Sequence, residues 1–143
     1  MEALTWAEIL SRMFYQLNPV WIAMIALFSI SIFYKRNLGL YGKLFDSKIG
    51  MIGFGIVMFW VFVGFFAGAL DLISTHDPLA QVSGMKNKVP GTPFRGADDD
   101  DYAFYLLGGD HLARDVFSRV MDGASIIIVI APLATLFAFM VGI

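Results

Sequence analysis

Three long runs of uncharged, apolar residues divide the chain, and polar stretches separate them. The runs are Pro19–Tyr34, Ile49–Leu70 and Ala124–Ile143. At a helical rise of about 1.5 Å per residue, the second and third runs match a hydrocarbon layer of roughly 30 Å. The first run reaches only about 24 Å by itself, and apolar neighbours on its N-terminal side extend it. The pattern therefore predicts three transmembrane helices, at 19–34, 49–70 and 124–143.

The two connections between these runs differ in charge. Residues 35–48 carry Lys and Arg with Asp46 as the single acid, whereas residues 71–123 carry aspartates as their only acids. Short loops rich in Lys and Arg stay in the cytoplasm. We therefore expect residues 35–48 to form a cytoplasmic basic loop and residues 71–123 an acidic external, periplasmic loop.

The N-terminal segment, residues 1–18, mixes charged residues with apolar ones at helical spacing, which predicts a short amphipathic helix at the membrane surface. The third run ends on the last residue without the polar flank that a completed span usually has. We therefore expect the chain to be truncated inside that span.

Composition supports a membrane protein, because 58% of the 143 residues are hydrophobic, whereas soluble domains are about 45–50% apolar. The mean hydropathy of +0.71 agrees with this. We expect an all-α integral membrane protein without a soluble core, in contact with membrane lipid. The absence of cysteine excludes disulfides and cysteine metal sites. No cluster of Lys and Arg alternates with aromatic residues, so nucleic-acid binding is not expected.

The stretch before the third run, residues 108–123, interleaves both signs of charge with apolar residues. Its spacing predicts an amphipathic interfacial helix over 110–123, with Asp110 as the N-cap. Asp110/Arg114 and Asp115/Arg119 are each four residues apart with the acid first, which favours pairing on a helix. The simplest interpretation is a solvated helix beside the membrane whose surface pairs contribute little.

Other polar residues are candidates for chemical sites. The acidic run Asp98–Asp101 lacks the spacing of a calcium loop. His76, Asp77, Asp110 and His111 lack the spacing of a zinc or catalytic site, so we expect no catalytic residue, metal or cofactor. Gly64 and Gly68 form a G-x-x-x-G pattern, which predicts close packing against a partner helix.

The order of residues around the charged stretch carries a resemblance. Residues 107–127 resemble the pattern L-G-T-D-x-x-G-R-D-x-x-S-R-x-x-x-G-A-R-x-S of the inner-membrane permease subunits of dipeptide/oligopeptide ABC importers. The matching residues are Gly108, Asp110, Arg114, Asp115, Ser118, Arg119, Gly123 and Ala124. The departures are Gly109 for Thr, Ala113 for Gly, Ser125 for Arg and Ile127 for Ser.

The resemblance is weaker over residues 46–81, where a predicted span leads to His76-Asp77-Pro78, and it does not reach the first 40 or so residues. It implies part of a peptide importer's permease in the cell inner membrane, not competent alone and not an enzyme. The implied partners are a second permease subunit, ATP-binding subunits and a periplasmic substrate-binding protein. The motif residues would then set helix geometry or contact partners. The alternative is a small membrane adaptor that binds a larger complex through the glycine-marked face of residues 49–70.

Overall fold

The structure is a computed structural model that describes residues 2–37, 39–94 and 101–142. Helices dominate these residues. They are α1 (Trp6–Gln16), α2 (Asn18–Tyr34), the 3₁₀ turn η1 (Lys35–Asn37), α3 (Gly39–Leu44), α4 (Lys48–Gly68) and α5 (Val116–Gly142). Two short strands, β1 (Thr92–Pro93) and β2 (Phe104–Tyr105), pair antiparallel between α4 and α5.

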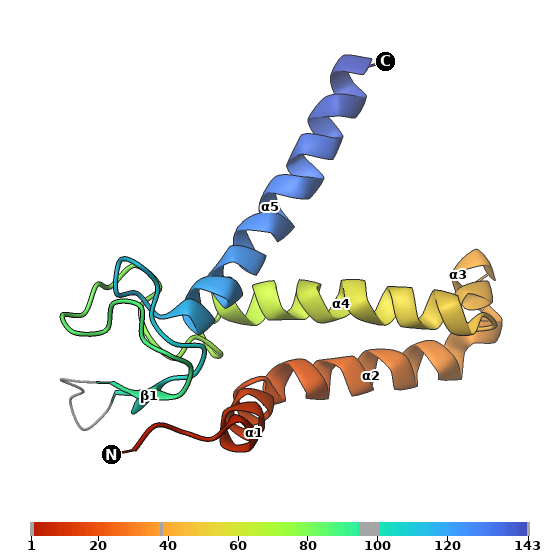
Figure 1. The fold of residues 1–143 in the computed structure, drawn as a ribbon. Coiled ribbons are helices and arrows are strands. Elements are labelled where there is room, and N and C mark those ends of the chain that lie inside the picture. Colours follow the sequence, from red (N-terminus) through yellow and green to blue (C-terminus); the bar gives the residue numbers. More distant parts are fainter. Residues whose placement is uncertain (1, 38, 95–100, 143) are drawn as a thin grey trace.

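Three helical segments are long and apolar enough to cross a membrane: α2 continued through η1, α4 and α5. They overlap the three predicted spans. Figure 1 shows α2 and α4 side by side and antiparallel, whereas α5 begins beside the C-terminal end of α4 and diverges from it. All residues of α5 from 129 to 142 are exposed, and most of them are apolar. The chain is thus mostly helical, with the spans of a multi-pass membrane protein.

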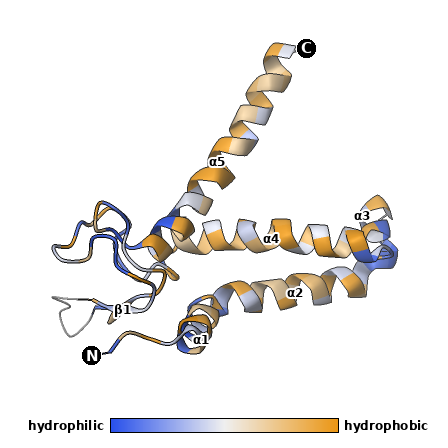
Figure 2. Cartoon of the chain, in the orientation of Figure 1, coloured by the Kyte–Doolittle hydropathy of each residue, from blue (hydrophilic) through white to orange (hydrophobic). Residues whose placement is uncertain are grey.

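Polar residues gather at opposite ends of α2 and α4 (Figure 2). At one end, η1 and α3 make a tight turn, where Lys35 forms an ion pair with Asp46 at 3.0 Å. The hydroxyl oxygens of Ser31 and Tyr41 lie 3.0 Å apart across the same turn. A Cβ on Gly42 would collide with the carbonyl oxygen of Lys35, so glycine permits this close return of the chain.

At the other end lies a folded unit that we call the cap, residues 69–94 and 101–115. The sequence predicted a protein without a soluble core, and this prediction is wrong for this segment. Ile73, Met85, Tyr105 and Leu106 are at most 1% exposed, and Phe117 of α5 is fully buried. Burying each such side chain stabilises the fold by roughly 1.5–3 kcal/mol. The cap is therefore a small packed unit joined to α5. Most of the acidic run Asp98–Asp101 lies outside the described residues.

The amphipathic helix α1 packs one face on the cap. Ile9 is 1% exposed, and the Arg12 guanidinium lies 4.9 Å from the centroid of the Phe104 ring. Gln16 Nε2 donates to the carbonyl oxygen of Ile73 at 3.2 Å. The helix begins with a capping box in which the side chains of Thr5 and Glu8 each bond the other's backbone N–H. These contacts fix α1 at the cap end of α2.

The opposite face of α1 is exposed and apolar. Trp6, Leu10 and Phe14 follow one another at four-residue intervals, and each is more than 60% exposed. An apolar row of this kind at the end of a spanning helix is typical of a helix lying in the membrane interface.

The predicted helix over residues 110–123 is wrong in its first half. Residues 110–115 form turns and an isolated bridge between Gly109 and Asp115, and the helix begins at Val116. From there it runs without a break through the predicted third span. The interfacial helix and the span are thus one helix, preceded by a compact turn.

Candidate functional site

The candidate site is the junction where the cap meets the start of α5, because most of the matched motif residues lie there. Its first part is a tight turn over residues 108–114. Gly108 has φ +80°, and a Cβ there would collide with the carbonyl oxygen of Lys88. A Cβ on Gly109 would likewise collide with the carbonyl oxygen of Met85. Glycine at both positions therefore lets two backbone segments touch.

Ala113 adopts a left-handed conformation, with φ +64°. This conformation costs roughly 1–2 kcal/mol for a residue with a Cβ, and glycine avoids the cost. The family pattern has glycine at this position. The carbonyl of Ala113 accepts hydrogen bonds from the backbone N–H of Val82 at 3.2 Å and the hydroxyl of Tyr105 at 3.4 Å. The surrounding cap therefore holds Ala113 in its strained geometry.

Asp110 organises the turn rather than capping a helix, so its predicted role as an N-cap is wrong. Its Oδ1 accepts the backbone N–H groups of Leu112 at 2.8 Å and Arg114 at 3.0 Å. Its Oδ2 accepts Arg114 Nε at 2.9 Å and lies 2.8 Å from Arg114 Nη2. Burial raises the pKa of Asp110, but the hydrogen bonds from Arg114 and Leu112 and the Arg114 charge outweigh it and lower the pKa to about 2.

Asp115 is the cap residue of α5. Its carboxylate accepts the backbone N–H groups of Phe117 at 3.2 Å and Ser118 at 3.3 Å, which are free donors of the first helical turn. The predicted Asp115/Arg119 ion pair does not form between these two described residues. Asp115 instead lies in the interior, with no exposed surface.

The buried carboxylate of Asp115 joins α5 to the segment that follows α4. Its Oδ2 accepts the hydroxyls of Thr75 and Ser118, both at 2.7 Å, and lies 3.1 Å from His76 Nδ1. Ser118 Oγ in turn accepts the backbone N–H groups of Thr75 at 3.1 Å and His76 at 3.0 Å. Burial raises the pKa of Asp115, but the hydrogen bonds from His76, Ser118 and Thr75 outweigh it and leave the pKa below its ordinary value.

His76 is held on both ring nitrogens. Nε2 lies 2.8 Å from the carbonyl oxygen of Tyr102, which can only accept, so Nε2 carries a hydrogen. Nδ1 lies 3.1 Å from Oδ2 of the Asp115 carboxylate. The ring centroids of Phe94 and Tyr105 lie 4.6 Å and 4.9 Å from that of His76. Burial and the charges of Asp115 and Asp110 raise the pKa of Tyr105 to about 12, so its hydroxyl stays neutral.

Ser118, His76 and Asp115 are the residue types of a hydrolase triad, but their bonds run in another order. The serine hydroxyl donates to the aspartate, and the histidine donates to a carbonyl rather than accepting from the serine. All three side chains are buried. Among the described residues, no group of three His, Asp or Glu side chains could hold a metal ion. The hydrogen bonds of this cluster join the segment after α4 to the start of α5.

Sequence reasoning missed Thr75 and the role of His76. About 40 residues separate them from Asp115, and no fixed spacing marks the contact. The neighbouring Asp77 instead accepts the backbone N–H of Leu79, and His111 is exposed at the tip of the turn. A Cβ on Gly123 would meet no described atom within 4 Å, so packing does not explain a glycine there.

The G-x-x-x-G face of α4 lies against α5 of the same chain. A Cβ on Gly64 would lie 2.8 Å from the carbonyl oxygen of Ala124, and a Cβ on Gly68 would lie 2.9 Å from Ser125 Oγ. Both contacts are closer than side-chain carbons tolerate. The two glycines therefore permit α4 and α5 to cross at short range.

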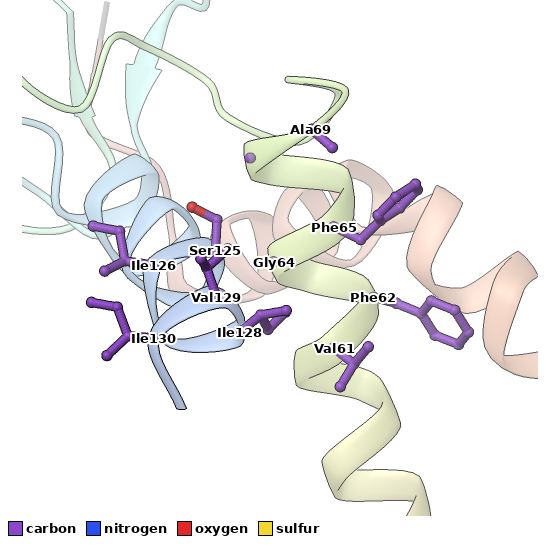
Figure 3. Close-up of a pocket in the computed structure, with 11 residues that line it drawn as sticks. Val61, Phe62, Gly64, Phe65, Ala69, Ser125, Ile126, Ile128, Val129 and Ile130 are labelled. Carbon is purple, nitrogen blue, oxygen red and sulfur yellow. The ribbon is translucent and has the colours of Figure 1, made fainter. Parts of the chain in front are cut away.

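Beside this crossing runs an open groove of about 750 Å³, in which Ser125 and Ile128 of α5 face Gly64 of α4 (Figure 3). Ser125 is the only polar side chain among the described residues that line it, and its hydroxyl donates to the carbonyl oxygen of Asp122 at 2.7 Å. The described residues of the groove thus form an almost entirely apolar surface.

A scan against protein-family models found no match, and searches of curated proteins and of solved structures found no significant match.

Proposed function

We propose that this chain is part of the transmembrane permease of an ABC importer for dipeptides or oligopeptides, in the inner membrane. The observation that carries the proposal is that matched motif residues share one junction. Gly108 and Asp110 shape the turn, Arg114 neutralises Asp110, and Asp115 and Ser118 hold the start of α5. If the residues matched the pattern by chance, we would not expect them to lie together and to stabilise the same turn and helix start.

Ala113 adds support because it departs from the pattern in an informative way. The family pattern has glycine at this position, and the backbone here has the positive φ that glycine favours. At Ala113 the backbone is thus suited to the family's residue, whereas at Gly109, where the pattern has Thr, a Cβ would collide with the carbonyl oxygen of Met85.

In this proposal the basic turn of η1 and α3 faces the cytoplasm and the cap faces the periplasm. A substrate-binding protein would deliver peptide at the cap side, a second permease subunit would complete the pathway, and cytoplasmic ATP-binding subunits would drive it. The charged residues of the junction set geometry and perform no chemistry. The adaptor alternative would dock through the glycine-marked face of α4, where α5 of the same chain already packs on Gly64.

Uptake of a labelled dipeptide or tripeptide by cells that carry the gene tests the proposal. Deleting the gene should abolish the ATP-dependent part of uptake, and the wild-type gene should restore it. A gene encoding Asp115→Asn should restore it poorly, whereas Asp77→Asn, at an exposed cap position, should restore it fully. Unchanged peptide uptake in the deletion strain would contradict the proposal.

A further inference from the structure

We propose that Arg119 binds the phosphate of a membrane lipid headgroup at the cap end of α5. The proposal requires α5 to span a bilayer and does not depend on the importer assignment. The carboxylate of Asp110, the nearest described acid to Arg119, already accepts as many hydrogen bonds as it can. An ionised carboxylate offers about four lone-pair positions. Leu112 and Arg114 together place four donors on them, at 2.8–3.0 Å.

The Nη1 atom of the Arg119 side chain is consequently left without a hydrogen-bond partner among the described residues. Its Nη1 lies 3.8 Å from Asp110 Oδ2, too far for a hydrogen bond. This Nη1 atom is buried, and within the described part of the chain it has no hydrogen-bond partner. Because Nη1 has almost no accessible surface, a phosphate would accept from the other guanidinium nitrogens, which match phosphate oxygens well. The rest of the side chain is reachable, because 39% of it is exposed.

The position of Arg119 along α5 selects the source of the phosphate. The uncharged part of the helix begins at Gly123 and runs to Gly142, which spans about 30 Å, the thickness of a hydrocarbon layer. Arg119 precedes this part by four residues, or about 6 Å along the axis. It therefore lies at the depth of the headgroups, where lipid phosphates are concentrated.

The neighbouring charges leave room for an anion. Arg114 neutralises Asp110, and His76 faces Asp115 in the interior. Asp122 lies three residues further along α5 and opposes anion binding, although it forms no ion pair with Arg119 within the described residues. Its removal should therefore strengthen the site.

Native mass spectrometry of the full chain in detergent tests the proposal, with dioleoyl phosphatidylglycerol as the probe. The wild-type chain should retain the lipid, and Arg119→Gln should retain roughly tenfold less, the size expected for one charge-assisted hydrogen bond. Arg119→Lys should recover part of the binding and Asp122→Asn should increase it. Lys86→Gln, which removes an exposed cap cation, should match the wild type. Equal retention by Arg119→Gln and the wild type would overturn the proposal.

Two further probes separate the phosphate from its source. Dioleoylglycerol, which has the same acyl chains and no phosphate, should not bind at this site. Inorganic phosphate at millimolar concentration should not displace the lipid, and displacement would overturn the lipid as the ligand. In the unmodified chain, the ¹⁵N resonance of the Arg119 side chain should shift with phosphatidylglycerol and not with dioleoylglycerol. This measurement needs no variant, and an unmoved resonance would equally overturn the site.

Discussion

Asp115 is the single residue that contributes most to the junction, because its buried carboxylate caps α5 and also contacts Thr75 and His76. Replacing the carboxylate with an amide removes an acceptor oxygen from this buried network. Asp115→Asn should therefore lower the free energy of unfolding by about 1–3 kcal/mol, the range for leaving a buried donor unsatisfied. Thermal unfolding in detergent measures this.

The control for that variant is Asp122→Asn, also on α5 but only half-buried. It should change the free energy of unfolding by less than about 0.5 kcal/mol, as surface substitutions usually do. Similar losses in the two variants would show that the buried network is not what matters.

Ala113 offers a gain in stability at a single position. Ala113→Gly should raise the free energy of unfolding by about 1 kcal/mol, because glycine adopts φ +64° without a Cβ clash. Ala113→Val should lower it, since a β-branched side chain is poorly tolerated there. Melting temperatures of the two variants check the order, and the reverse order would contradict the left-handed turn.

Asp110 predicts how the turn responds to acid. Its pKa is lowered from 3.8 to about 2 in the folded protein, so its contribution to stability is complete above pH about 4 and is lost as the pH falls toward 2. The protection factors of the Leu112 and Arg114 amides, which correct hydrogen-exchange rates for the intrinsic effect of pH, should therefore fall over this interval. Asp110→Asn should already have low protection factors at pH 5, with a flatter pH profile. A wild-type profile equally flat from pH 5 to pH 2 would contradict this role.

At the scale of elements, the crossing of α4 and α5 depends on small residues. Gly64→Val should destabilise the protein by about 1–3 kcal/mol, because the new side chain meets Ala124 and Ile128 in a packed contact. Gly53→Val, in the same helix but with no atom within 4 Å of the new Cβ, is the matched control. Thermal unfolding of both variants measures the difference, and equal melting temperatures would exclude close packing at Gly64.

At the scale of the whole molecule, two polar ends separated by apolar helices predict one orientation. The chain has no cysteine, so single cysteines can be introduced as unique labels. Lys86→Cys in the cap should react with a membrane-impermeant maleimide added to intact cells, and Lys43→Cys in the basic turn should react only after the cells are opened. Both positions are exposed, so accessibility in the fold does not limit either reaction. The opposite labelling would reverse the topology and remove the basis of the importer proposal.

The three helices were predictable because an uncharged run of about 20 residues has few other stable structures in a bilayer. The pair Asp110–Arg114 was also predictable from spacing, although the backbone that holds it is a turn and not a helix. Two side chains four residues apart can meet in a turn as well as in a helix. For this reason the spacing predicted the contact between Asp110 and Arg114 correctly but not the secondary structure around it.

The sequence by itself determined the apolar spans, the charged ends and the glycines that allow close approach, since these follow from local composition and backbone freedom. Only the tertiary structure decided that the acidic segment folds into a cap with its own core. It also decided that Asp115 is buried against Thr75 and His76. Contacts between residues some 40 positions apart depend on the path of the whole chain, and a local pattern of hydrophobic and polar residues does not predict that path.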